Sequence, residues 1–187
     1  TLHRIRHIKT GKLGGWIQSE KNLSQTGKAW VYGNAQVSSN AQVSADAQVS
    51  GDARVFGKAR VYGNARVFGK AQVFDKAWVF ADAWVFDNAY VSGNARVFDK
   101  AWVFDNARVA GNARVSGDAW VSDKAQVYGD AQISDKAWVF GNAWVYDNAR
   151  VYDNAQVYGD AQIYGKAQVY GDAVTNNAQV SGNKHLR

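Results

Sequence analysis

Apolar residues follow a strict six-residue period along most of the chain. Alanine occurs at every sixth position from Ala29 to Ala173, and each of the first twenty-four is followed two residues later by Val or Ile. Residues two apart in an extended segment point to the same side, so each such pair shares one face. The pair that ends each unit, such as Gly63-Asn64, is rich in Gly, Asp and Asn, which favour turns. Each unit of six residues is therefore predicted to form a short strand and a corner.

Three units make one triangular coil of 18 residues, and successive coils stack with parallel strands about 4.8 Å apart. The twenty-five units predict about eight coils around a narrow interior of Ala, Val and Ile. Residues 1–28 break the period and form a predicted cap, residues 29–175 form the repeat domain, and residues 176–187 form the C-terminal end. The next alanine there is Ala178, one residue early, so the coil is expected to loosen. The predicted fold is an all-β, single-stranded triangular solenoid.

The repeat resembles the hexapeptide-repeat left-handed β-helix family, in which an aliphatic residue is followed four places later by a small one, as Val61 is by Ala65. The segment 11–37 is similar to the entry segment of YdcK-type bacterial and prophage proteins. The residues that carry this second likeness are Gly14, Gly15, Trp16, Asn22, Leu23, Ser24, Trp30, Val31 and Tyr32. The resemblance implies a left-handed coil, an exception to the right-handed rule for parallel strand crossovers.

Folding the repeat at 18 residues per coil places four tryptophans in consecutive coils of one face. Beside them runs a second column, in the order Tyr32, Ser50, Phe68, Phe86, Phe104, Ser122, Phe140 and Tyr158. We call seven residues of these two columns the aromatic wall, namely Trp84, Trp102, Trp120, Trp138, Phe86, Phe104 and Phe140. Two hypotheses remain open: the rings stack to stabilise the coils, or they form an exposed apolar patch that binds a partner. The predicted partner is a second copy of the chain in a two-fold dimer, with another protein or a carbohydrate as alternatives.

The net charge of +6 lies at the ends of the chain, since the repeats hold fourteen Lys and Arg against fifteen Asp. One face nevertheless combines arginines with aromatic rings, which is typical of a polyanion or nucleic-acid platform. The residues of this arginine face are Arg60, Arg96, Arg114 and Arg150, with Tyr62, Phe80 and Phe98 beside them. The corner that follows is rich in Asp, and Arg–Asp pairing is expected, so nucleic acid is the less favoured partner.

Candidate catalytic chemistry is sparse in this chain. The family resemblance implies acyltransferases or zinc enzymes, which use histidines at coil junctions, but the three histidines are His3, His7 and His185, outside the coils. The many Asp lie at corners, where bonding to their own backbone explains them. We therefore predict no catalytic residue, no metal site and no cofactor, and an acyltransferase-like protein stays open as an alternative.

Two further features bear on location and use. The chain has no Cys and no apolar run of about 18 residues, its first residues lack a hydrophobic signal core, and its start at Thr1 is compatible with trimming. We expect a cytoplasmic protein without a membrane span. The unit DKAWVF occurs at 75–80, 99–104 and 135–140, spacings that do not keep it on one face. Such copying suits a rigid, non-catalytic scaffold or interaction module.

Overall fold

The computed structural model describes residues 1–8, 10–172 and 174–187, and strands dominate them. The only helical turn among these residues is η1 (Glu20–Asn22). Sheet A contains β1 (His3–Arg6), β2 (Leu13–Ile17), β4 (Gln36–Val37), β7 (Arg54–Val55), β10 (Gln72–Val73), β13 (Tyr90–Val91), β16 (Arg108–Val109), β19 (Gln126–Val127), β22 (Trp144–Val145), β25 (Gln162–Ile163) and β28 (Gln179–Val180). Sheet B contains β5 (Gln42–Val43), β8 (Arg60–Val61), β11 (Trp78–Val79), β14 (Arg96–Val97), β17 (Arg114–Val115), β20 (Gln132–Ile133), β23 (Arg150–Val151), β26 (Gln168–Val169) and β29 (His185–Leu186). Sheet C contains β3 (Trp30–Val31), β6 (Gln48–Val49), β9 (Arg66–Val67), β12 (Trp84–Val85), β15 (Trp102–Val103), β18 (Trp120–Val121), β21 (Trp138–Val139), β24 (Gln156–Tyr158) and β27 (Val174–Asn176).

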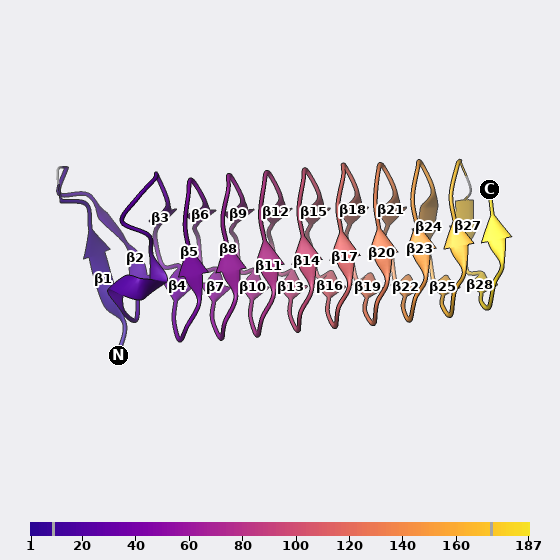
Figure 1. The fold of residues 1–187 in the computed structure, drawn as a ribbon, viewed down its shortest axis with the longest axis horizontal. Helices are drawn as coiled ribbons and strands as arrows, with labels where there is room; N and C mark the ends of the chain where they lie inside the picture. Colours follow the sequence, from indigo (N-terminus) through magenta and orange to yellow (C-terminus); the bar gives the residue numbers. More distant parts are fainter. Residues whose placement is uncertain (9, 173) are drawn as a thin grey trace.

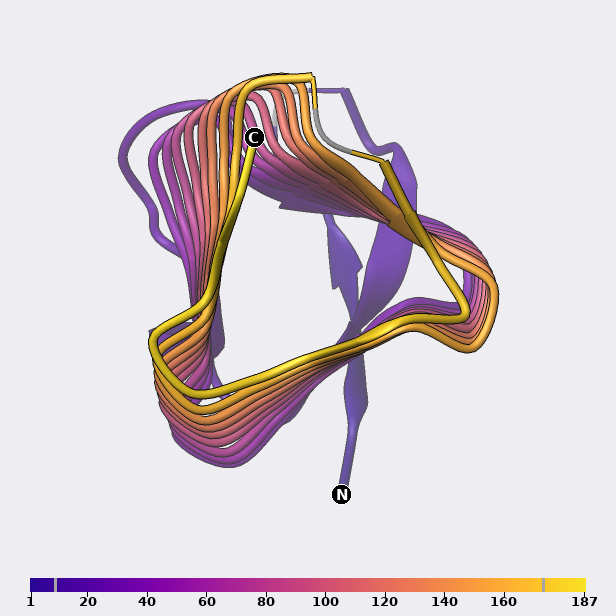
Figure 2. The ribbon, with the colours of Figure 1, turned by 90° about the vertical axis from the view of Figure 1, so that its right-hand side faces the viewer.

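The three sheets form the sides of a triangular solenoid, and each coil contributes one strand to each side (Figures 1 and 2). Every strand of the repeats pairs in parallel with the strand 18 residues away, as Trp84 does with Trp102. Seen from the C-terminal end in Figure 2, the chain turns clockwise as it advances toward the viewer, which is the left-handed sense. The predicted fold class is therefore confirmed, and about nine turns replace the eight expected.

Both ends of the chain add strands to the repeats, β2 in the cap and β28 and β29 in the C-terminal segment. The missing residue shortens the spacing in sheet A to 17 residues, so that Gln162 pairs with Gln179. Sheet B then ends with His185 beside Gln168. The ladder therefore absorbs the deletion and continues, where the sequence suggested that the coil would loosen.

The interior is built from the predicted alanines and valines. From Val31 to Val169 every one of these Ala, Val and Ile side chains is 0–1% exposed. Ala173, the last alanine of the period, lies outside the described residues. Because each interior side chain is small, the three sheets approach closely enough to leave one continuous apolar core.

Each corner places its first residue in the left-handed region of the backbone. Gly occupies most of these positions, as at Gly63 with φ +71° and Gly111 with φ +71°, while Asp takes many others, as at Asp105 with φ +56°. A side chain on Gly63 would also lie 2.9 Å from the backbone nitrogen of Ala81 in the next coil. Glycine is thus favoured at such a corner both by its φ angle and by close stacking.

Ala45 and Ala81 are the least suited of the corner residues, because alanine at φ +57° has neither glycine's freedom nor a polar side chain that bonds locally. We expect Ala81→Gly to raise the free energy of unfolding by about 0.5–1 kcal/mol in a denaturant titration. The matched control is Ala110→Gly, since Ala110 is also half-buried but has an ordinary φ. That change should lower stability by about 0.5–1 kcal/mol, and equal losses in both variants would contradict the prediction.

An irregular first coil carries the cap. Strand β1 pairs antiparallel with β2, and β2 joins sheet A through Trp16 and Gln36. The two glycines that open β2 are needed because backbone lies against them. A Cβ on Gly14 would come 2.6 Å from the Val31 carbonyl oxygen, and one on Gly15 would come 2.6 Å from that of Ala35.

Asn22 fastens this cap to the first regular coil and is the one buried polar residue among those described. Its Oδ1 accepts hydrogen bonds from the backbone N–H groups of Gln18 at 3.1 Å and Ser19 at 2.8 Å. Its Nδ2 donates to the carbonyl oxygens of Ser39 at 3.0 Å and Ala41 at 2.9 Å. One amide therefore bonds four backbone groups, and of these the N–H of Gln18 also donates to the Val37 carbonyl oxygen at 3.0 Å.

Candidate interaction surface

The four tryptophans of the aromatic wall lie on sheet C as one stack of indoles. Ring centroids are 5.1 Å apart for Trp84 and Trp102, 5.1 Å for Trp102 and Trp120, and 4.9 Å for Trp120 and Trp138. Neighbouring planes differ by no more than 3°. The ladder register imposes this arrangement, because each indole leaves its strand at the same position one coil later.

The phenylalanines of the wall form a second stack at the adjoining corner. Phe86 and Phe104 stack at 5.0 Å, and Phe68 extends the column by stacking on Phe86 at 4.9 Å. The two columns also touch edge to face, as between Phe104 and Trp120 at 6.2 Å and 79°. Phe140 stands apart from Phe104 because Ser122 occupies the coil between them. The structure thus brings together all seven predicted residues, with one interruption.

Stacking covers most of each ring but leaves the outward edges in water. Trp84, Trp102 and Trp120 are half-buried, whereas Trp138 is 40% exposed. Both faces of Trp102 and of Trp120 are occupied by neighbouring indoles. A sugar that stacks on aromatic rings needs a free ring face, so this column gives the carbohydrate alternative little support. A flat partner that contacts only the edges of the rings does not need a free ring face.

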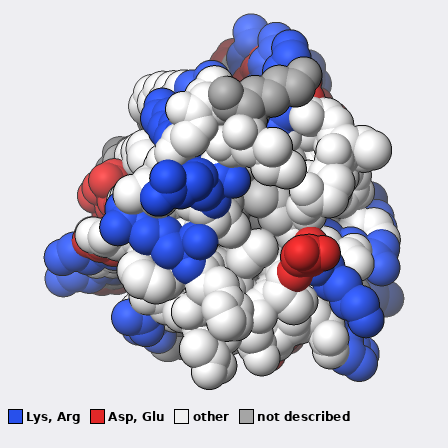
Figure 3. Space-filling view, turned by 90° about the vertical axis from the view of Figure 1, so that its left-hand side faces the viewer, with Lys and Arg blue, Asp and Glu red and all other residues white. Residues whose placement is uncertain are grey.

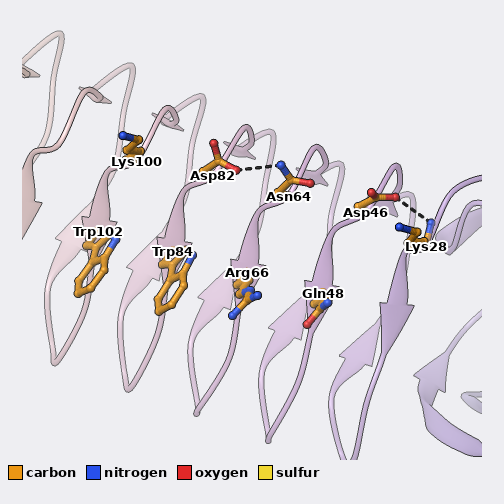
Figure 4. Close-up of a pocket in the computed structure, with 9 residues that line it drawn as sticks. All are labelled: Lys28, Asp46, Gln48, Asn64, Arg66, Asp82, Trp84, Lys100 and Trp102. Atoms are coloured by element: carbon orange, nitrogen blue, oxygen red, sulfur yellow. Dashed lines mark hydrogen bonds between the residues drawn. The ribbon is translucent and has the colours of Figure 1, made fainter.

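A groove of about 560 Å³ runs along the corner beside the first part of this column (Figure 4). Its lining residues are Lys28, Asp46, Gln48, Asn64, Arg66, Asp82, Trp84, Lys100 and Trp102. Asn64 donates to Asp82 at 2.9 Å, and the guanidinium of Arg66 lies 5.0 Å from the centre of the Trp84 ring. The groove mixes three cationic side chains with two carboxylates, so its charge does not favour a ligand of either sign.

Four of the seven arginines of the repeats, namely Arg60, Arg66, Arg96 and Arg108, pack on aromatic rings. Arg60 and Arg96 lie on either side of Trp78, with guanidinium carbons 5.3 and 5.0 Å from the ring centroid. The sequence predicted Arg–Asp pairing instead, and that interpretation is wrong for the described residues, where no Arg lies within ion-pair distance of a carboxylate. The reason is register, since Arg and Trp share one column, whereas every Asp sits at a corner.

The corner carboxylates bond to the neighbouring coil. Asp75 Oδ2 accepts a hydrogen bond from the N–H of Gly93 at 3.1 Å, and Asp123 Oδ2 accepts one from Gly141 at 3.0 Å. Both partners are 18 residues away, so the aspartates join successive coils, whereas the sequence suggested bonds to their own backbone. These bonds assign the corner aspartates a structural role.

Three tyrosines at the other corners have perturbed acidity. Burial raises the pKa of Tyr128 above its ordinary value, and the neighbouring Tyr146 and Asp147 raise it further. Burial likewise raises the pKa of Tyr146 and of Tyr152, and in both the next tyrosine in the stack adds to the effect. These rings stack at 5.0 and 5.1 Å in their columns, and the protonated phenol fits such a stack best.

Two of the three histidines lie in the cap, as the sequence predicted, whereas the third, His185, lies in the last strand of sheet B. His3 belongs to β1 and His7 packs edge to face on Trp30 at 5.5 Å, while His185 is in β29. No group of three or more His, Asp or Glu in the described ranges is placed to hold a metal ion. The cap end is rich in Lys and Arg, as Figure 3 shows, although Lys9 falls outside the described residues. In the part of the chain that the structure describes, no helix has the length and apolar character needed to cross a membrane.

Comparison with known families agrees with this architecture. A model of the YdcK β-solenoid repeat matches residues 47–61, 59–75, 107–123 and 143–159. The coils resemble the YdcK β-solenoid repeat. Each matched segment has about the length of one coil, and all four cover residues of the aromatic columns or the groove beside them. No curated protein matches the chain.

Two features of the structure, Asn22 in the cap and the gap at Ser122, were not predicted from the sequence. Asn22 was singled out only as part of a short motif, and nothing in the sequence indicates its four hydrogen bonds. The interruption at Ser122 is visible in the order of the second column, but its significance depends on the stacking distances of the rings on either side.

Proposed function

We propose that the chain is a rigid, non-catalytic scaffold that associates with a second copy of itself through the aromatic wall. The observation that carries this proposal is the stack of four indoles on one flat side of the solenoid. Adjoining phenylalanines widen it into one contiguous apolar patch, the kind of surface that marks an interaction site. A flat, self-similar surface of this kind packs well about a two-fold axis.

Two further observations support a scaffold. The A-x-V period runs without interruption from residue 29 to 173, so no loop leaves the coils to shape an acceptor site. Trp78 lies on sheet B while Trp102 and Trp138 lie on sheet C, although all three come from the same DKAWVF unit. A length-variable rod tolerates such copying, and an active site does not. Membership of the hexapeptide-repeat family is part of this proposal, and the period supports it.

Stacking and association do not exclude one another. The ring faces stabilise the coils, at about 0.5–1.5 kcal/mol for each aromatic pair. The ring edges and the exposed side of Trp138 are then the surface offered to the partner. Rings at such an interface are already held in place, so little side-chain entropy is lost on binding.

The test is Trp84→Arg with Trp102→Arg, measured as solution mass by light scattering after size exclusion. Arginines are tolerated in such a ladder, because Arg96 and Arg114 are neighbours in sheet B. We expect the wild-type chain to have twice the mass of its 20.5 kDa monomer and the double variant to have the monomer mass. Two charged residues in the interface should weaken association at least a hundredfold.

The matched control is Trp144→Arg. Trp144 is as exposed as Trp138, at 40%, but stands alone on sheet A between Gln126 and Gln162. This variant should keep the dimer mass. A monomeric wild-type chain, or a double variant that still dimerises, would show the proposal to be wrong.

A further inference from the structure

The second column of sheet C lacks one ring in the middle of its stack. Phe104 is stacked on Phe86 at 5.0 Å, and Phe140 is stacked on Tyr158 at 5.0 Å. Each therefore has one ring face covered and one face directed toward the coil of Ser122. Those two faces are two strand spacings apart, about 10 Å, which leaves room between them for one ring.

Ser122 is the floor of a hollow of about 200 Å³ at this place. Its other lining residues are Phe104, Trp120, Trp138 and Phe140. Four of the five residues are thus aromatic, and no charged side chain lines the hollow. The hydroxyl of Ser122 forms no hydrogen bond with the part of the chain that the structure describes, so one polar group at the floor is available.

The contacts of Trp138 also reflect the absence of a ring at position 122. Elsewhere in the wall each tryptophan meets the phenylalanine of the preceding coil edge to face, as Trp102 meets Phe86 at 6.0 Å and Trp120 meets Phe104 at 6.2 Å. The equivalent neighbour of Trp138 would stand at position 122. Trp138 contacts only Phe140 of its own unit in this way, at 6.4 Å, and it is more exposed than the other three indoles.

We propose that the hollow at Ser122 is a binding slot for one uncharged planar aromatic ring of a small molecule, of the phenol or indole class. The ring would complete the column by stacking between Phe104 and Phe140, with its edge against Trp138. Its O–H or N–H group would reach the Ser122 hydroxyl. A charged or non-planar group would lose these contacts, because the walls are parallel ring faces.

The chain contains a natural comparison for this slot. Ser50 interrupts the same column between Tyr32 and Phe68, and this gap is one coil wide, like the gap at Ser122. There the neighbours on sheet C are Gln48 and Arg66, which are polar. The Ser50 gap therefore has the same width but lacks the aromatic side walls, and we expect it not to hold the ring.

The experiment is a nuclear magnetic resonance titration of p-cresol and of indole. Protons of a ring held between two aromatic faces move upfield, so the ligand signals report the stacked position itself. We expect upfield shifts with the wild-type chain and their loss in Ser122→Phe, which fills the slot with the residue found at positions 104 and 140. Ser50→Phe, the same change at the comparison gap, should bind like the wild type. Ser122→Ala should bind about fivefold more weakly, through loss of one hydrogen bond.

The proposed slot and the proposed dimer can be tested independently of one another. Trp84→Arg with Trp102→Arg leaves all five lining residues in place, so ring binding is also measured in that variant, where the wall is not covered by a second copy. Upfield shifts there, absent in the same variant carrying Ser122→Phe, support the slot whatever the wild-type mass is. Absence of shifts in that background overturns it.

Three other outcomes would also overturn the slot. The first is equal loss of binding in Ser50→Phe, and the second is binding of the peptide Gly-Tyr-Gly without binding of free p-cresol. If Ser122→Phe fails to fold, as judged by circular dichroism, then Trp138→Gln removes one wall instead. Unchanged shifts in that folded variant would be the third.

Discussion

Replacing Asn22 by aspartate should lower the free energy of unfolding by about 3–5 kcal/mol. The change keeps the shape of the side chain but puts an oxygen where Nδ2 now donates to the carbonyl groups of Ser39 and Ala41. A carboxylate buried at 1% exposure would face two carbonyl oxygens without a compensating cation. The cap should therefore detach from the first coil at lower denaturant concentration than in the wild type.

Chemical denaturation followed by circular dichroism measures this loss, and hydrogen exchange locates it. Exchange should rise first at Gln18 and Ser19, between β2 and η1, whose N–H groups donate to Asn22. Asn40→Asp is the control, because it makes the same chemical change at an exposed corner. That variant should stay within about 0.5 kcal/mol of the wild type. A similar loss in both variants would mean that the clamp is unimportant.

Deleting one unit should leave the fold intact and destroy the aromatic wall. Removal of residues 105–110 keeps the six-residue period, so every interior position of the repeats remains Ala, Val or Ile. Each later unit, however, moves by one side of the triangle, which takes Trp120 and Trp138 from sheet C to sheet B. We expect cooperative unfolding close to that of the wild type and a monomeric solution mass. Ring binding should persist, because Ser122 moves together with Trp120 and Trp138 and then lies between Phe98 and Phe140.

Deleting a whole coil is the matched experiment. Removal of residues 105–122 places Trp138 directly after Trp102, and Phe140 directly after Phe104. The wall is then continuous and shorter, while the gap at Ser122 is gone. This variant should keep the dimer mass and lose ring binding. Unfolding of either deletion variant at room temperature would argue against a repeat whose coils interact only with their neighbours.

The sequence was enough to predict the core and the ladder, because both follow from a period that repeats without error. Once 18 residues per coil was inferred, the alignment of Trp84 with Trp102 followed directly, and the structure confirms it. The handedness came from a family resemblance, since the period is compatible with either hand.

Features that depend on one irregular contact were not predictable in this way. The carboxylate of Asp75 bonds to the next coil rather than to its own turn, and composition does not separate these two arrangements. Arginine was assigned to Asp by charge alone, but Arg96 lies on the Trp78 ring because both leave the same face. The roles of Asn22 and of the gap at Ser122 depend in the same way on their neighbours in space, and a pattern along the sequence does not identify those neighbours.

The constant spacing of the ladder also determines how this rod comes apart. Each regular coil pairs with the next through residues 17 or 18 apart, so closing each new coil costs the same small loop entropy. Folding can therefore proceed as a zipper from the clamped cap, without the slow long-range search typical of other all-β proteins. Under a stretching force the same ladder would release one coil at a time, in equal steps of about 60 Å of chain.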